Sequence, residues 1–176
     1  MDSTIVSAAQ EISFLALIGF ENNSFSLLWR GSRDGFDAAA FHRLCDGKAN
    51  TVTVIKNTSG FIFGGFTSIP WSSSVGYKAD STAFLFSLTN PSNTPLKMKV
   101  KSPEDAVVHF SGFGPTFGAG YDLHALNLSH TNRNSYMKFG FYEFPNEIEG
   151  IEGGKLIVGG FDHKFQTAEI EVFQVL

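Results

Sequence analysis

The feature that most constrains the fold is a change of hydrophobic period at Thr51. Residues 51–56 (TVTVIK) and 61–66 (FIFGGF) are rich in β-branched and aromatic side chains, and the turn formers NTSG separate them, which predicts a hairpin. Turn residues also bound further expected strands at 83–88, 96–100, 106–110, 121–128, 155–161 and 167–175. Several strands beside two helical patterns predict a mainly β, α+β fold: a two-sheet antiparallel β-sandwich with short flanking helices.

The last expected strand shows the clearest alternation. Ala168, Ile170 and Val172 alternate with Glu169 and Glu171. Successive side chains of a strand point to opposite faces, so we expect the first three to be buried and both carboxylates to face outward. The outward face then meets either water, which is the ordinary case, or a partner.

Before Thr51 the apolar spacing is helical. Residues 7–18 are expected to form a helix that ends before Gly19 and turns one side toward the domain, with Ile12, Leu15 and Ile18 on that side. We predict a single domain over residues 1–176, with residues 1–19 packed on it as an N-terminal helix.

A second helix is predicted in residues 36–47, ended by Gly47 and capped by Asp34. Its spacing indicates a face buried against a sheet, made by Phe36, Ala40 or Phe41, and Leu44. Residues 150–154 are acidic and glycine-rich, and we expect a loop there.

Composition limits the kinds of partner that the chain can bind and the cellular compartment in which we expect it. The net charge of −4 comes without any cluster of Lys or Arg, which argues against DNA or RNA as partners. Cys45 is the lone cysteine, so no internal disulfide forms and a reducing, cytoplasmic setting is expected. The apolar run near the N-terminus is too short to span a bilayer and follows no basic leader, so neither membrane insertion nor a signal peptide is expected.

Residues 27–71 carry SRDGF, FHRLCDGK, TVIK and FGGFTSIPW in the order in which they occur in the TLDc family. This segment resembles the front half of that domain, which is found in oxidation-resistance proteins and beside TBC and LysM domains. AFLFSLTN, SGFGPTFGAGYDLHAL, SHTNRNSY and FQTAEIEVFQV continue the resemblance over nearly the whole chain. LIVGGFDHKF departs from the family's usual closing strand, and residues 141–153 match no family motif.

The resemblance implies a two-sheet sandwich and a role in protection from oxidative stress. For several members it also implies binding to the vacuolar-type proton-ATPase, and it brings no settled enzymatic chemistry. We therefore expect a monomeric, non-catalytic protein-binding module without cofactor or metal. Two alternatives remain: a direct antioxidant that uses Cys45, and a stress-signalling scaffold with another partner.

Two groupings of side chains could carry chemistry. His42 and Cys45 are three residues apart on the expected helix, where an imidazole can activate a thiol for redox reactions; the alternative is a buried, structural cysteine. Asp122 and His124 share one face of an expected strand, but their spacing matches no zinc signature, and hydrogen-bonded residues of the core are the simpler interpretation.

The candidates for partner contact are Arg33, Trp71, Glu169 and Glu171. Each has a structural alternative: Arg33 can pair with Asp34, Trp71 can anchor the core, and the carboxylates can be ordinary solvated groups. Asp34 and several glycines are expected to have structural roles in turns and close packing, namely Gly35, Gly64, Gly65, Gly112 and Gly114.

Overall fold

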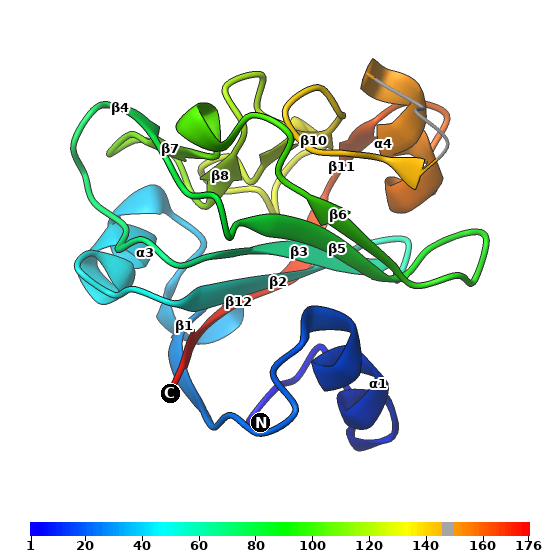
Figure 1. Ribbon diagram of the computed structural model, residues 1–176, viewed down its shortest axis with the longest axis horizontal. Coiled ribbons are helices and arrows are strands. Elements are labelled where there is room, and N and C mark those ends of the chain that lie inside the picture. The colour runs from blue at the N-terminus through cyan, green and yellow to red at the C-terminus, as the bar shows by residue number, and fades with distance from the viewer. Residues whose placement is uncertain (146–149) are drawn as a thin grey trace.

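The computed structural model describes residues 1–145 and 150–176. Within these ranges the strands form two six-stranded sheets in which all paired strands are antiparallel. The sheets stack face to face, and helix α1 lies on the far side of the first sheet (Figure 1). The predicted mainly β, α+β sandwich is confirmed.

The first sheet has the longer strands. Its order is β1 (Phe25–Arg30), β12 (Thr167–Val175), β2 (Thr51–Asn57), β3 (Ile62–Thr67), β5 (Phe84–Thr89) and β6 (Leu96–Lys99). The predicted hairpin is β2–β3, in which Lys56 lies opposite Ile62. Because β12 lies between β1 and β2, the C-terminal strand is an internal strand of the sheet.

The second sheet is built from strands of two or three residues. Its order is β11 (Lys164–Phe165), β10 (Ser135–Met137), β9 (Leu123–His124), β8 (Thr116–Phe117), β7 (Val107–His109) and β4 (Gly76–Lys78). The strand predicted at 121–128 is thus confined to β9. We did not predict β4, β8, β10 or β11, because runs this short carry no periodic signal.

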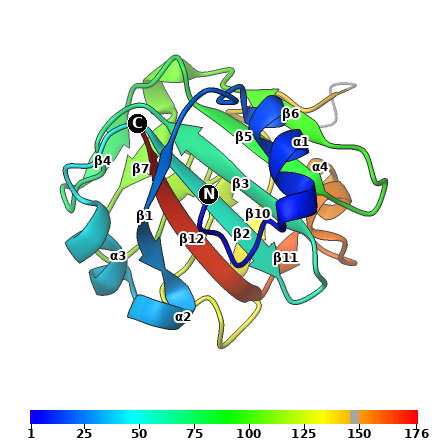
Figure 2. The same ribbon diagram turned by 90° about the horizontal axis from the view of Figure 1, so that it is seen from below.

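Helix α1 (Ala8–Ile18) confirms the predicted N-terminal helix and ends at Gly19 in a left-handed conformation (φ 86°). The predicted buried face is only partly correct: Leu15 and Ile18 pack against the sheet, but Ile12 does not. Ile12 is 81% exposed, whereas Phe14 and Ile18, one turn apart, are buried against the sheet. Figure 2 shows the helix lying across the sheet near β5 and β6.

The second helical region contains a single turn, α2 (Gly31–Asp34), and a longer helix, α3 (Ala38–Cys45). The prediction that Asp34 caps the longer helix is wrong. Asp37 is the N-cap, and its side chain accepts a hydrogen bond from the backbone N–H of Ala40 at 2.8 Å. The Asp34 carboxylate is instead engaged by Arg33 and by the backbone N–H of Arg30.

Helix α4 (Gly150–Val158) corrects two predictions, the strand at 155–161 and the loop at 150–154. One of the glycines that suggested a loop allows close packing: a Cβ on Gly154 would lie 1.7 Å from the carbonyl oxygen of Met137 in β10. Residues 148 and 149, which begin the same acidic stretch, lie outside the described residues. A 3₁₀ turn, η1 (Pro103–Asp105), follows β6.

Apolar side chains gather in two clusters. One fills the space between the sheets and includes Ile55 and Val172 from the first sheet and Leu123 and Met137 from the second. The other lies on the outer side of the first sheet, beneath the N-terminal residues, and includes Phe14. In the described ranges, the helices are too short or too polar to cross a bilayer.

Candidate interaction site

The carboxylate of Glu171 is at the centre of the candidate site. Glu171 belongs to the internal strand β12, and its side chain is completely shielded from solvent. Arg30, the last residue of β1, lies opposite it in the ladder and donates from Nε to Oε1 at 2.7 Å. A buried carboxylate is tolerated only when it is paired and hydrogen-bonded, so loss of Arg30 would leave an uncompensated buried charge.

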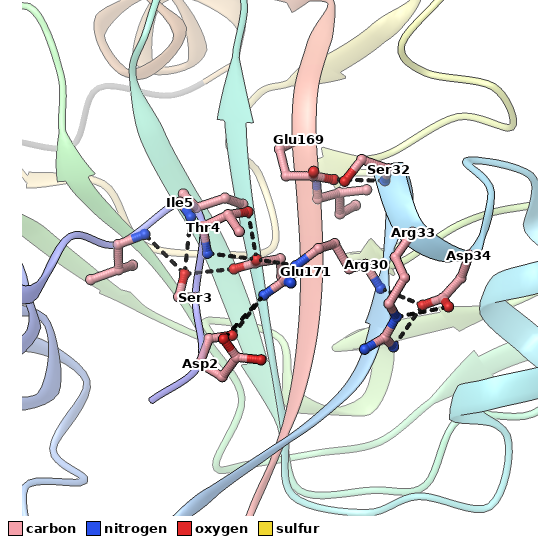
Figure 3. Close-up of polar contacts among 12 residues, drawn as sticks. Asp2, Ser3, Thr4, Ile5, Arg30, Ser32, Arg33, Asp34, Glu169 and Glu171 are labelled. Atoms are coloured by element: carbon pink, nitrogen blue, oxygen red, sulfur yellow. Dashed lines mark hydrogen bonds and ion pairs between the residues drawn. The ribbon is translucent and has the colours of Figure 1, made fainter.

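The N-terminal residues supply the other partners of this carboxylate. Residues 2–6, which we call the N-terminal strap, run beside β12 (Figure 3). Ser3 donates its hydroxyl to Oε2 at 2.6 Å, and Thr4 donates its backbone N–H and its hydroxyl to Oε1, both at 2.9 Å. Arg30 also donates from Nη2 to the backbone oxygen of Asp2 at 2.7 Å. The strap therefore closes over both members of the ion pair.

We expected Glu171 to face outward and to meet water or a partner; the side of the sheet was predicted correctly, but the carboxylate meets residues of the same chain instead. The alternation placed it on the outer side of the first sheet, but that side is covered by the strap. Glu169 is half-buried and accepts a hydrogen bond from the backbone N–H of Ser32 at 3.1 Å. Ala168 is exposed rather than buried, because the register with β2 shifts between Thr167 and Glu169.

The predicted ion pair of Arg33 and Asp34 is confirmed. Two parallel hydrogen bonds join them, Nε to Oδ1 at 2.9 Å and Nη2 to Oδ2 at 2.8 Å. The guanidinium of Arg33 lowers the pKa of the Asp34 carboxyl below its ordinary value. Asp34 also accepts from the backbone N–H of Arg30, so it links the end of β1 to α2. About half of the Arg33 side chain is exposed, and its contact with a partner stays a prediction.

Cys45 lies in the core at the end of α3 and is completely buried. Burial raises the pKa of its thiol far above the ordinary value, which keeps the sulfur protonated and poorly nucleophilic. His42 is engaged elsewhere: Nδ1 lies 2.7 Å from Oδ1 of Asp46, and Nε2 lies 3.0 Å from the carbonyl oxygen of Phe110. The geometry therefore favours a structural cysteine.

Asp122 and His124 are both buried and both used in local structure. Oδ2 of Asp122 accepts three backbone N–H bonds at 2.9 Å, from Gly140, Phe141 and Tyr142. His124 pairs through Nδ1 with the hydroxyl of Thr116 at 2.9 Å, and burial lowers its pKa to about 4. Among the residues that the structure describes, no three His, Cys, Asp or Glu side chains are grouped to hold a metal ion.

Comparison with known proteins decides the family. The model of the TLDc domain matches residues 3–176. The chain belongs to the TLDc domain family. A curated relative, MTOR-associated protein MEAK7 of Danio rerio, is 43% identical over 44 residues. That match covers 25% of this chain and 10% of the relative, so the matched segment is a small part of both proteins.

The remaining motif residues of this TLDc domain lie in its core and turns. Trp71 is 1% exposed and donates its indole N–H to the hydroxyl of Thr51 at 2.8 Å, so it belongs to the core and is not a surface contact. A Cβ on Gly64 would lie 1.9 Å from the carbonyl oxygen of Thr53, and one on Gly65 would meet the ring of Phe117 at 2.8 Å. Both glycines therefore permit close packing within the sandwich.

The loop glycines of the TLDc motifs differ from one another. A Cβ on Gly114 would lie 2.7 Å from the carbonyl oxygen of Ala125, so this position is closely packed. One on Gly112 would meet only the ring of Phe110, at 3.2 Å. Gly35 follows α2 with φ 101°, a backbone conformation that side chains disfavour.

Sequence reasoning missed the partners of Glu171. Ser3 and Thr4 precede the first helical residue and have the composition of an ordinary N-terminal tail. Arg30 stands next to a motif rather than inside it. One signal could have found them: Glu171 lies on a strand that is internal to the sheet. A carboxylate buried on such a strand needs a cation or hydrogen-bond donors from other parts of the chain.

Proposed function

We propose that this TLDc domain is a non-catalytic protein-binding module that acts in oxidative-stress protection by engaging the cytosolic, peripheral sector of the vacuolar-type proton-ATPase. The observation that carries this proposal is the family match over residues 3–176, which spans all the motifs from SRDGF to the last strand. The name of the Danio rerio relative, MTOR-associated protein, supports association with other proteins as the mode of action.

Regulation by such a module requires differential binding. A domain shifts the equilibrium between the assembled and the separated proton-ATPase only if it binds one of these states more tightly. A monomeric domain in the cytoplasm with a rigid surface suits this role. The titratable groups singled out by the sequence support a non-catalytic role, because Cys45, His42 and Asp122 are each buried or engaged in structural hydrogen bonds.

Direct binding to the purified peripheral sector tests the proposal. We would immobilise the TLDc domain, measure equilibrium binding by biolayer interferometry, and follow ATP hydrolysis by the assembled enzyme as the domain is added. Saturable binding accompanied by a change in hydrolysis is expected, with the same affinity for the Cys45→Ala variant. Absence of binding, together with recovery of unrelated signalling proteins from cytosol, would favour the scaffold alternative.

The thiol alternative has its own measurement. Because Cys45 is buried and its thiol pKa is raised, the folded domain should react with Ellman's reagent at least about 100-fold more slowly than the domain unfolded in urea. Rapid, stoichiometric reaction of the folded domain would revive the direct antioxidant, in particular if the Cys45→Ala domain also lost its protective effect in cells exposed to peroxide.

A further inference from the structure

The outer side of the second sheet carries a row of polar and aromatic side chains. In the register of the sheet, Tyr136 of β10 lies between His124 of β9 and Lys164 of β11. The neighbouring positions, Leu123 and Met137, are buried in the cluster between the sheets. Because side chains alternate along a strand, Tyr136, His124 and Lys164 share the opposite, outward side.

Rings from two loops extend this row. The ring of Phe113 packs against that of His124 with centroids 4.7 Å apart, and Tyr121 stacks on the same imidazole at 5.0 Å. On its other side His124 approaches Tyr136 at 5.4 Å. With the rings at its two ends, these form what we call the aromatic stripe: Phe110, Phe113, Tyr121, His124, Tyr136 and His163.

The stripe has the character of a contact surface. Tyr121, Tyr136 and Phe113 are half-buried, and neither phenol hydroxyl has a hydrogen-bond partner among the described residues. Tyrosine offers a large, rigid ring and a polar group at low cost in entropy, and it is enriched where protein interfaces carry their energy. Burial lowers the pKa of His124 to about 4, so this imidazole is uncharged at neutral pH, and burial also lowers the pKa of His163.

Positive charge lies at the β10–β11 end of the stripe. The Nζ atom of Lys138 is 5.7 Å from the centroid of the Tyr136 ring, and Lys164 projects from β11. Within the described ranges, neither lysine has a carboxylate within salt-bridge distance. Two nearby carboxylates are paired, Asp162 with Arg133 at 3.2 Å and Glu152 with Lys155. A third, Asp122, is buried beneath the stripe, accepts three backbone N–H bonds and interacts electrostatically with Lys138. In a chain of net charge −4 this is a local excess of positive charge.

We propose that the aromatic stripe, together with Lys138 and Lys164, is the docking surface for an acidic polypeptide segment that carries aromatic side chains. The carboxylates of the segment would pair with the two lysines, and its rings would lie on Tyr136 and Tyr121. The proposal deepens the proposed function, since it names the chemistry of the partner, but it does not depend on which protein supplies the segment. Two lysines in an acidic chain are too few to hold a nucleic-acid backbone.

The test uses the whole chain and a fluorescein-labelled 12-residue peptide of alternating glutamate and tyrosine, followed by fluorescence anisotropy. We expect binding by the wild type and at least about tenfold weaker binding by the double variant Lys138→Glu, Lys164→Glu. Tyr136→Ala should weaken binding to a similar extent. The control, Lys48→Glu with Lys99→Glu, makes the same change in net charge at two exposed lysines outside the stripe and should alter the affinity less than about twofold.

Three results would overturn the proposal. The first is equal weakening by the two double variants, which would mean attraction to net charge alone. The second is no binding of the peptide to a wild-type chain whose folding has been verified by circular dichroism. The third is stronger binding of anionic phospholipid vesicles or single-stranded DNA than of the peptide, lost in Lys138→Glu, Lys164→Glu. If the domain bound the peptide but not the proton-ATPase, the proposed target would be rejected, whereas the assignment of the aromatic stripe as a docking surface would stand.

Discussion

The outer sides of the two sheets differ in how far other parts of the chain cover them. On the first sheet, α1 and the N-terminal strap cover an apolar cluster that includes Phe14 and Phe173, and they enclose the ion pair of Glu171 and Arg30. On the second sheet, the rings of the aromatic stripe other than the buried His124 are partly exposed, and Lys164 projects into solvent. In Figure 1, α1 lies on one side of the first sheet, and the short strands, their loops and α4 lie on the other.

This contrast suggests that the outer side of the first sheet serves stability and that the outer side of the second sheet serves recognition of a partner. Glu171 and Lys164 are both charged residues on the outer sides of strands, yet one is completely buried and the other is exposed. A charge that is sealed away from water stabilises the fold only through its partners, whereas an exposed charge contributes little to stability and remains able to meet another protein. We therefore expect substitutions on the first side to unfold the domain and substitutions on the second to change its binding.

The largest effect should come from removing the buried carboxylate. Glu171→Ala leaves Arg30 without its partner and strips acceptors from Ser3 and Thr4, which should cost about 3–5 kcal/mol of unfolding free energy. Lys164→Ala, the matched change on the second sheet, should stay within about 0.5 kcal/mol. Urea denaturation measures the unfolding free energy of both variants. Comparable losses of unfolding free energy would contradict the proposed difference between the two sides.

A second test concerns the packing of α1 against the first sheet. Phe14 is fully buried and its ring meets that of Phe86 edge-on at 5.4 Å, so Phe14→Ala should lose about 3 kcal/mol of unfolding free energy. Ile12 lies on the same helix but points into solvent, and Ile12→Ala should change stability by less than about 0.5 kcal/mol. Thermal unfolding compares the two, and a small effect of Phe14→Ala would mean that the helix is not firmly seated.

The buried imidazole of His124 should make the stability of the domain depend on pH. His124 has a folded-state pKa of about 4 against 6.5 in a model peptide, so below pH 6.5 the unfolded chain binds a proton that the folded chain refuses. Stability is therefore lost as the pH falls from 6.5 toward 4, by about 1 kcal/mol between pH 7 and 5.5 for this residue. His124→Gln should reduce that loss in urea titrations, and an undiminished loss in this variant would mean that another group is responsible.

The parts of the fold that sequence predicted are those with a periodic signal. The hairpin of β2 and β3 and the helix after Ser7 were placed correctly because their patterns extend over six residues or more. The alternation in β12 gave the correct side for Glu171 but not its burial, since the covering strap is distant in sequence. Helix α4 was missed because its glycines resemble those of a loop, although Gly154 fits closely against Met137.

The candidate site was less predictable than the fold. The pairing of Arg33 with Asp34 could be foreseen, because the two are adjacent and of opposite charge. The pairing of Arg30 with Glu171 could not, because it spans the chain and depends on the order of strands in the sheet. The aromatic stripe depends likewise on the register of strands too short to recognise, which brings Tyr136 beside His124.

Lysine footprinting of the complex with the purified peripheral sector of the proton-ATPase tests most directly that this TLDc domain binds through the second sheet. Acetylation of each lysine with and without the partner would be read by mass spectrometry. We predict that Lys138 and Lys164 become protected on binding, while Lys48 and Lys99 react as before. Unchanged acetylation of Lys138 and Lys164 in a complex that demonstrably forms, with protection of Lys48 or Lys99 instead, would contradict the assignment of this face to recognition.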